Sequence, residues 1–193
     1  MSEIITDSNM SFELALADNP ADPCPPEILG SLSLLEVRYK GFDKQTHAGQ
    51  IVVAAVVESE VRQFFRQAQA LEFPIEHVVP AADPRFRWDD EKIMAANVSS
   101  GFNYRPIAGT DKLSRHSQGL AFDINPRQNP YIRYENGEEI TQPPDAAWDK
   151  YVPGTLNANH PLVRMMESLG WEWGGNWAPE SGRVDYQHFE KPL

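Results

Sequence analysis

The sequence of 193 residues contains one cysteine and few basic residues, and both shortages exclude classes of protein. Cys24 has no second cysteine to pair with, so an internal disulfide framework and a cysteine-based zinc finger are excluded. The 17 lysines and arginines stand against 28 aspartates and glutamates, which gives a formal net charge of −11. Binding to nucleic acid and to anionic membranes depends on basic side chains, so we expect neither partner.

Long hydrophobic runs are also missing. The longest unbroken apolar run, Ile51–Val57, is far shorter than the roughly 20 residues that span a bilayer. Residues 1–10 are acidic and polar and do not resemble a secretory signal, so the export route is left open. An apolar fraction of 41% argues against disorder, and the length fits a single domain. We therefore expect one folded domain and a monomer.

The first 30 residues differ in composition from the rest of the chain. Residues 18–26 are acidic and rich in proline, which disfavours helix, so we expect no helix from Ala17 to Pro26. The interpretation is a Pro-rich arm over residues 1–30 followed by one domain over residues 31–193. Cys24 lies in this arm, where nothing nearby would lower its pKa, and is interpreted as an incidental thiol.

Periodicity and punctuation predict an α+β fold, because helices and short strands follow one another without regular alternation. Apolar residues at three- and four-residue steps predict a helix from Gly49 to Phe73, ended by Pro74. A helix at Pro161–Leu169 would be closed by Gly170. The other predicted elements are a helix at 89–97 with Met94 and Ala95 inside, strands at 75–79, 102–107, 120–124, 171–173 and 184–189, and a long surface excursion at 125–159.

Chemistry concentrates first around His116 and Asp123, which are separated by seven positions. On a regular strand an odd separation places two side chains on opposite faces, but Gly119 can provide a bend that brings both into one pocket. Asp123 lies in an apolar strand, where a carboxylate needs an ionic partner or a metal.

A second stretch places Asp185 three residues before His188. Two imidazoles and one carboxylate suit zinc and leave a fourth coordination position for water, while Asp185 remains available as a base. From spacing alone a different interpretation stays open, in which His116 and Asp123 form a buried hydrogen-bonded pair and His188 is a core residue.

These residues resemble the signatures of a known family. The pattern from Ser114 to Asp123, Ser-x-His-x-x-Gly-x-Ala-x-Asp, resembles that of the D-Ala-D-Ala carboxypeptidase and L-Ala-D-Glu endopeptidase family of zinc peptidases. The same family includes the D-Ala-D-Ala dipeptidases of vancomycin resistance and phage endolysins. Asp185 and His188 match its second signature. Flanking similarities extend the resemblance over about residues 35–192, at 99–105, 125–126, 129–131 and 170–175.

The resemblance implies a hedgehog/DD-peptidase-like fold, with a small antiparallel sheet flanked by helices and zinc in a cleft on the sheet. It implies that His116, Asp123 and His188 hold Zn²⁺. Asp185 would be the catalytic base and later the acid that protonates the leaving amine, and Arg105 would bind the scissile carbonyl oxygen. Two further roles stay open. A surface salt bridge is the alternative for Arg105. Ser114 either contacts a metal ligand or the substrate, or it is only a hydroxyl at the end of a strand.

The other histidines and tryptophans match no ligand pattern. We expect surface or capping roles for His47 and His160, and a core or edge position for His77. The tryptophans are expected in the core, with a substrate cleft as the alternative, and they are Trp171, Trp173 and Trp177.

The function implied by the resemblance is zinc-dependent cleavage of peptidoglycan stem peptides, of the L-Ala-D-Glu endopeptidase or D-Ala-D-Ala carboxypeptidase type. The alternative is a non-catalytic zinc-containing module that binds wall peptides, against which the presence of Asp185 argues. Either would act in the periplasm or the cell wall. A phage lysin and a secreted effector both fit a chain without a visible signal.

Overall fold

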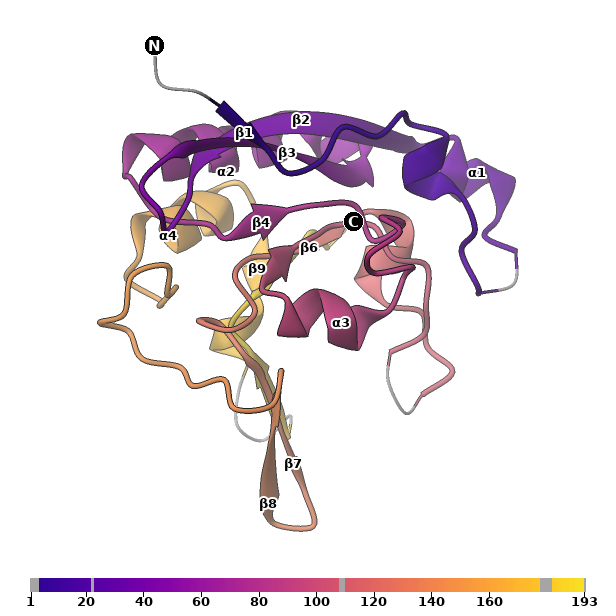
Figure 1. Ribbon diagram of the computed structural model, residues 1–193. Coiled ribbons are helices and arrows are strands. Elements are labelled where there is room, and N and C mark those ends of the chain that lie inside the picture. Colours follow the sequence, from indigo (N-terminus) through magenta and orange to yellow (C-terminus); the bar gives the residue numbers. More distant parts are fainter. Residues whose placement is uncertain (1–3, 22, 108–109, 178–181, 193) are drawn as a thin grey trace.

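A computed structural model describes the chain, and Figure 1 shows its arrangement. Two long antiparallel strands, β2 (Leu32–Lys40) and β3 (Thr46–Ala54), dominate the N-terminal half. β1 (Ile4–Thr6) pairs with β3 in parallel, so the N-terminal arm contributes a strand to this sheet. Helix α2 (Glu58–Ala70) packs against β2. The described residues are 4–21, 23–107, 110–177 and 182–192.

A second, antiparallel sheet has the strand order β6-β11-β9. It consists of β6 (Ala121–Asp123), β11 (His188–Glu190) and β9 (Glu172–Trp173). Helix α4 (Pro161–Ser168) contacts β9 and α2, so the two helices and the two sheets enclose one core.

A third sheet, of order β10-β7-β8, stands apart from this core. The hairpin β7 (Tyr131–Glu135) and β8 (Glu138–Gln142) projects away from the body of the molecule (Figure 1). β10 (Arg183–Asp185) pairs antiparallel with β7 and leads directly into β11 of the second sheet.

Short elements complete the fold. Helix α3 (Asp90–Ala95) is capped by the Asp89 side chain, which accepts a hydrogen bond from the Lys92 amide. The remaining elements are α1 (Pro26–Leu29), the parallel pair β4 (His77–Val78) and β5 (Val98–Ser99), and 3₁₀ turns at Leu14–Leu16, Ala55–Val57, Arg115–Gln118 and Gly174–Asn176.

The main core is built around the aromatic face of α2. The ring of Phe64 meets Phe122 and Phe189 edge-on at centroid distances of 5.2 and 5.6 Å, and the latter two rings stack on each other. Phe122 and Phe189 are the central residues of β6 and β11, flanked by Asp123 and His188. Packing of α2 therefore holds the two strands on which these candidate metal ligands stand.

A smaller core includes residues of β2 and β3 together with residues of the N-terminal arm. Ala15 is buried there, and the indole nitrogen of Trp88 donates to the Ala17 carbonyl at 2.9 Å. Cys24 is only partly exposed, and burial together with Glu27 raises the pKa of its thiol. The arm therefore packs on the domain, and the thiol has no activating partner among the described residues.

The predicted helix at 49–73 is wrong in its first part, because residues 49–54 form the end of strand β3. Ile51, Val52 and Val53 are buried, so both faces of the strand are covered and the alternation of a half-buried strand is lost. The helix begins at Glu58, and its buried face follows the predicted spacing through Phe64 to Ala68. Strand β2, the antiparallel partner of β3, was not predicted.

Three further predictions need correction. Residues 102–107 form no strand apart from an isolated bridge between Pro106 and Leu113. The segment 184–189 is not one strand, since a turn at 186–187 divides it between two sheets. In α3 the residues that face inward are Ile93 and Met94, whereas Ala95 is exposed.

The excursion at 125–159 is more ordered than predicted. It contains the β7–β8 hairpin, and Asn125, Asn129 and Leu156 within it are fully buried. Both asparagine amides donate to the Gly154 carbonyl, and the amide of Leu156 donates to Asn129 Oδ1. These side chains supply the hydrogen bonds that a buried loop needs.

Other predictions are confirmed. The helix at 161–168 is followed by Gly170 with a φ of 82°, the left-handed conformation of a helix-ending glycine. The helix within 89–97 and the strand within 120–124 are present. The α+β class is also confirmed, while the hedgehog-like fold remains an expectation from the family resemblance.

Candidate metal centre and cleft

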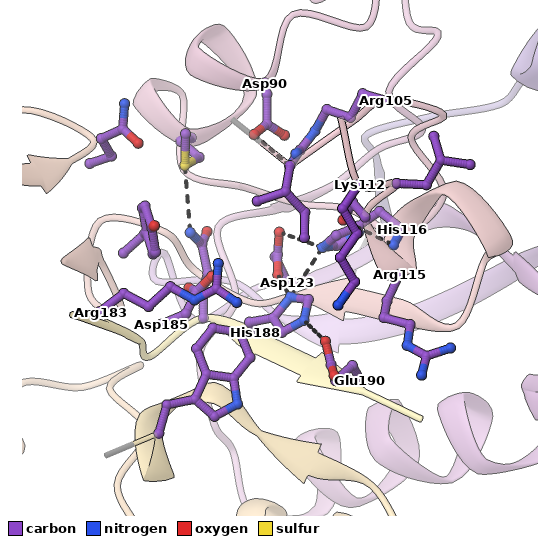
Figure 2. Close-up of a pocket in the computed structure, with 18 of the residues that line it drawn as sticks. Asp90, Arg105, Lys112, Arg115, His116, Asp123, Arg183, Asp185, His188 and Glu190 are labelled. Atoms are coloured by element: carbon purple, nitrogen blue, oxygen red, sulfur yellow. Dashed lines mark hydrogen bonds and ion pairs between the residues drawn. The ribbon is translucent and has the colours of Figure 1, made fainter. Parts of the chain in front are cut away.

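A cleft of about 780 Å³ opens beside the second and third sheets and contains the three residues predicted to bind zinc (Figure 2). The side chains of His116, Asp123 and His188 are buried, and their ligand atoms all lie within 4.8 Å of one another. Both acidic and basic side chains line the cleft, and they are Asp90, Arg105, Lys112, Arg115, Arg183, Asp185 and Glu190.

His116 is held by the turn in which it stands. The Ser114 hydroxyl caps this turn by accepting from the His116 amide at 3.3 Å. Gly119 ends the turn with a φ of 66°, and a Cβ there would lie 2.5 Å from the Ala54 amide nitrogen. This glycine is the predicted bend, which lets His116 and Asp123 face the same pocket.

Asp123 and His188 are direct cross-strand neighbours on β6 and β11. Their closest atoms, Asp123 Oδ1 and His188 Nδ1, are 3.0 Å apart. His116 Nε2 lies 3.1 Å from His188 Nδ1 and 3.2 Å from Asp123 Oδ2. Ligand atoms at 2.0–2.2 Å from a tetrahedral zinc stand about 3.3–3.6 Å apart, so this triangle is close to the size that zinc requires.

The outer nitrogen of each ring also has a partner. His116 Nδ1 donates to the Gly101 carbonyl at 2.6 Å, and His188 Nε2 donates to Glu190 Oε2 at 3.0 Å. With a metal bound, these bonds would keep the protons on the outer nitrogens and leave the lone pairs of His116 Nε2 and His188 Nδ1 for the metal. Such partners orient metal-binding imidazoles and raise their basicity, so the donor set fits zinc.

The carboxylates of the site favour a positive charge on or next to the two histidines. Burial alone would lower the pKa of His188, but its hydrogen bonds with Asp123 and Glu190 raise it to about 10. Burial likewise opposes ionisation of Asp123, yet the two histidines hold the pKa of its carboxyl well below the usual range. The hydrogen bond from His188 lowers the pKa of Glu190. A divalent cation would satisfy the same preference.

Asp185 lies beside these ligands on β10 and lines the cleft. Its Oδ1 is shielded from solvent and accepts no hydrogen bond from the described residues. Burial raises the pKa of Asp185 to about 7, against the opposing field of His188. A carboxyl that titrates near neutral pH is suited to accept and return a proton.

The remaining predicted site residues are divided between the cleft and the core. Arg105 lines the cleft, where its Nη2 lies 2.7 Å from Asp90 Oδ2. The Ser114 hydroxyl holds the turn of His116, as described. Trp173 packs in the core, its indole nitrogen donating to the Tyr186 carbonyl, whereas Trp177 lines the cleft.

Sequence reasoning missed several residues of the cleft. Glu190 had a local signal, since a residue two positions after His188 on a strand faces the same side. Tyr131 and Gln142 reach the cleft through the pairing of β7 with β8, for which the turn at Asn136 and Gly137 was the local signal. Arg183 was also missed, and its guanidinium lies 4.8 Å from the centroid of the ring of Trp177. The cleft position of Trp177 matches the alternative predicted for it.

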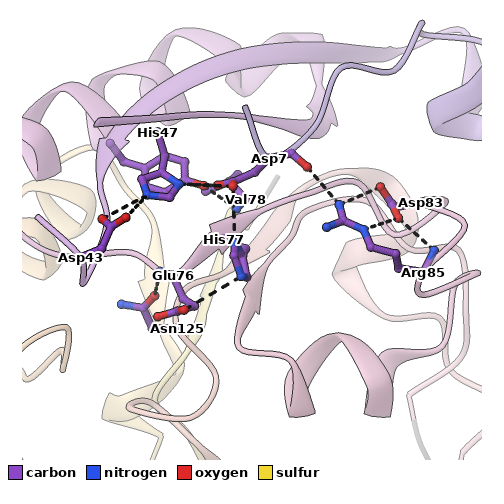
Figure 3. A network of polar contacts seen from close by, with 10 residues as sticks. Asp7, Asp43, His47, Glu76, His77, Val78, Asp83, Arg85 and Asn125 are labelled. Atoms are coloured by element: carbon purple, nitrogen blue, oxygen red, sulfur yellow. Dashed lines mark hydrogen bonds and ion pairs between the residues drawn. The ribbon is translucent and has the colours of Figure 1, made fainter. Parts of the chain in front are cut away.

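The other histidines lie elsewhere. His47 is buried, so the surface or capping role predicted for it is wrong, whereas His160 caps α4 by accepting from the Leu162 amide as predicted. Figure 3 shows His47 between two carboxylates, with its Nδ1 3.1 Å from Asp7 and its Nε2 3.2 Å from Asp43. His77, at the edge strand β4, lies 3.6 Å from Asp7 on the other side. This network ties the N-terminal arm to β3 and β4.

Two imidazoles and one carboxylate form a group that could hold one metal ion, and a further carboxyl of raised pKa lies beside them, as in the mononuclear centres of metal-dependent hydrolases. Residues 108–191 match a family model described as D-alanyl-D-alanine carboxypeptidase. Over this segment the chain is similar to that family of zinc peptidases, in agreement with the resemblance that the motifs indicated. The match includes both signatures but begins after Arg105, so it is shorter than the predicted resemblance.

Comparison with curated proteins and with solved structures gave no match. Among the described residues, no helix is both long and apolar enough to cross a membrane.

Proposed function

We propose that the protein is a zinc-dependent peptidase that hydrolyses a peptide bond in peptidoglycan stem peptides, of the D-Ala-D-Ala carboxypeptidase or L-Ala-D-Glu endopeptidase type. One observation carries the proposal: the buried group of His116, Asp123 and His188 shares a cleft with Asp185, whose buried Oδ1 has no hydrogen-bond partner among the described residues. All four residues belong to the proposed peptidase domain, residues 31–193. We expect the protein to act in the periplasm or the cell wall, and the family match supports this expectation.

His116 Nε2, His188 Nδ1 and Asp123 would hold the zinc. When bound, zinc would activate a water and polarise the scissile carbonyl. Asp185 takes a proton from the attacking water, which its raised pKa allows near neutral pH, and returns it to the leaving amine.

Arg105 is proposed to hold the carbonyl oxygen as it gains negative charge. Its bond to Asp90 does not prevent this, because a guanidinium has five N–H donors and the residue lines the cleft. Asp90 would then fix the direction of the guanidinium.

The test is a digestion of purified sacculi and synthetic stem peptides, with products identified by mass spectrometry. We expect fragments from the zinc-loaded protein, none after chelation, and recovery after zinc is restored. His116→Ala should lose bound zinc and activity together. Asp185→Asn should keep its zinc but lose about 100-fold or more in kcat. A folded, zinc-loaded protein that releases no fragment would instead support the wall-peptide binding module.

A further inference from the structure

The side of the cleft that holds Asp185 also presents a cation. Arg183 and Asp185 are two positions apart on β10, so their side chains project from the same face of the strand. Both line the cleft, and Figure 2 shows them on one side of the candidate ligands, with Lys112 on the other.

Arg183 is oriented by its neighbour Trp177. The guanidinium carbon lies 4.8 Å from the centroid of the indole ring, in a cation–π contact. The Trp177 ring in turn lies against His188, with centroids 5.5 Å apart. A guanidinium over an aromatic face keeps its N–H groups at its edge, where they can bind a planar carboxylate through two parallel hydrogen bonds.

The two peptide bonds proposed as substrates have one chemical feature in common. In D-Ala-D-Ala the leaving residue carries its amine and a free carboxylate on the same carbon. In L-Ala-D-Glu the glutamate continues the stem through its side-chain carboxyl, so its α-carboxylate is also free beside the leaving amine. Both leaving groups are thus α-amino acids with an unblocked α-carboxylate.

We propose that Arg183 binds this α-carboxylate, and that the enzyme selects stem peptides in which the carboxylate is free rather than amidated. The proposal rests on the function proposed above, because Asp185 locates the leaving amine. Residues two apart on a strand are separated by about 6.6 Å. A leaving group that carries an amine and a carboxylate on one carbon can therefore contact both side chains, with its amine at Asp185 and its carboxylate at Arg183.

The test compares substrates that differ only in this group: stem peptides ending in D-Ala-D-Ala or its carboxamide, and peptides with L-Ala-D-Glu or L-Ala-D-isoglutamine. For the bond that the wild type cleaves, we expect kcat/KM to be about 10- to 100-fold higher for the free carboxylate, as for hydrogen bonds to a charged group. Arg183→Ala should remove this preference, mainly by raising KM for the carboxylate form. Arg183→Lys should restore part of it, because the charge remains but the planar fork is lost.

Lys112→Ala is the matched control, since it removes one positive charge from the opposite side of the same cleft. It should leave the ratio between the two substrates at the wild-type value, and the zinc content of each variant should equal that of the wild type. The proposal is overturned if the wild type cleaves both forms equally, if Arg183→Ala slows both equally, or if Lys112→Ala abolishes the preference instead. A zinc-loaded wild type that cleaves none of the four peptides would refute the proposed function, and this inference with it.

Discussion

The carboxylate of Asp7 is expected to hold the N-terminal arm on the domain, so Asp7→Asn should lower the free energy of unfolding. The side chain of Asp7 is only 7% exposed, accepts a hydrogen bond from the Tyr39 hydroxyl and contacts His47 at 3.1 Å. A hydrogen bond to a charged group contributes about 1.5 kcal/mol or more. Weakening two of them should cost about 3 kcal/mol, which lowers the Tm of a chain of this length by about 6–12 °C.

The effect of this substitution should depend on pH. Burial alone would raise the pKa of Asp7, but the ion pair with His77 and the hydrogen bonds from Tyr39 and His47 outweigh burial and lower it. A lowered carboxyl pKa contributes stability above the unfolded value of about 3.9, and the contribution is lost as the pH falls through the folded pKa. The carboxylate of Asp7, 3.6 Å away, raises the pKa of His77. The contribution of His77 to stability is complete below about pH 6.5 and is lost as the pH rises through its folded pKa.

The difference in Tm between the wild type and Asp7→Asn should therefore be largest between about pH 4 and 6.5 and smaller at pH 9. Thermal unfolding followed by circular dichroism across this range measures it. Asp111→Asn, which removes an exposed carboxylate, is the control and should change the Tm by less than about 2 °C. An Asp7→Asn protein as stable as the wild type at pH 5.5, or a difference that grows above pH 7, would refute the reasoning.

Two further substitutions test the metal centre and its support. Glu190→Gln weakens the hydrogen bond that orients His188 and should lower zinc affinity about 10- to 100-fold. A competition titration with a chelating dye measures this affinity. An unchanged affinity would contradict the assignment of the proton to His188 Nε2. Gly119→Ala should destabilise the protein by about 2–4 kcal/mol in urea unfolding, because its Cβ meets the Ala54 backbone and its φ is positive. Gly137→Ala is the control, since its φ is also positive but its Cβ would meet nothing within 4 Å, and it should cost only about 1–2 kcal/mol.

The candidate metal ligands could be predicted because their signals are local. A carboxylate inside the apolar strand of Asp123 needs a compensating charge, and Gly119 is the one glycine between it and His116. The arrangement of the ligands in space is not local. It depends on the pairing of β6 with β11, which joins positions 65 residues apart.

The error at residues 49–54 has a physical origin in burial. A strand covered on both faces shows a continuous apolar run, and such a run fits the apolar face of a helix as well as a strand. The β-branched residues Ile51, Val52 and Val53 favour the strand, but the partner that decides the matter is β2, whose pairing is not visible in a single stretch of sequence. Asp7 and His47 were missed for the same reason, since they meet only when β1 joins β3.

The wall of the cleft was missed although one local signal for it was present. Asn136 and Gly137 both have positive φ and form a two-residue connection between β7 and β8, the turn for which Asn-Gly is the preferred sequence. This turn sets the register that places Tyr131 opposite Gln142, and β10 then places Asp185 opposite Tyr131 on the other side. Three residues of the cleft thus stand on one rung across three strands. A shift of the hairpin by one residue would turn Gln142 to the opposite face, so the shape of the cleft beside the proposed base depends on a turn outside it.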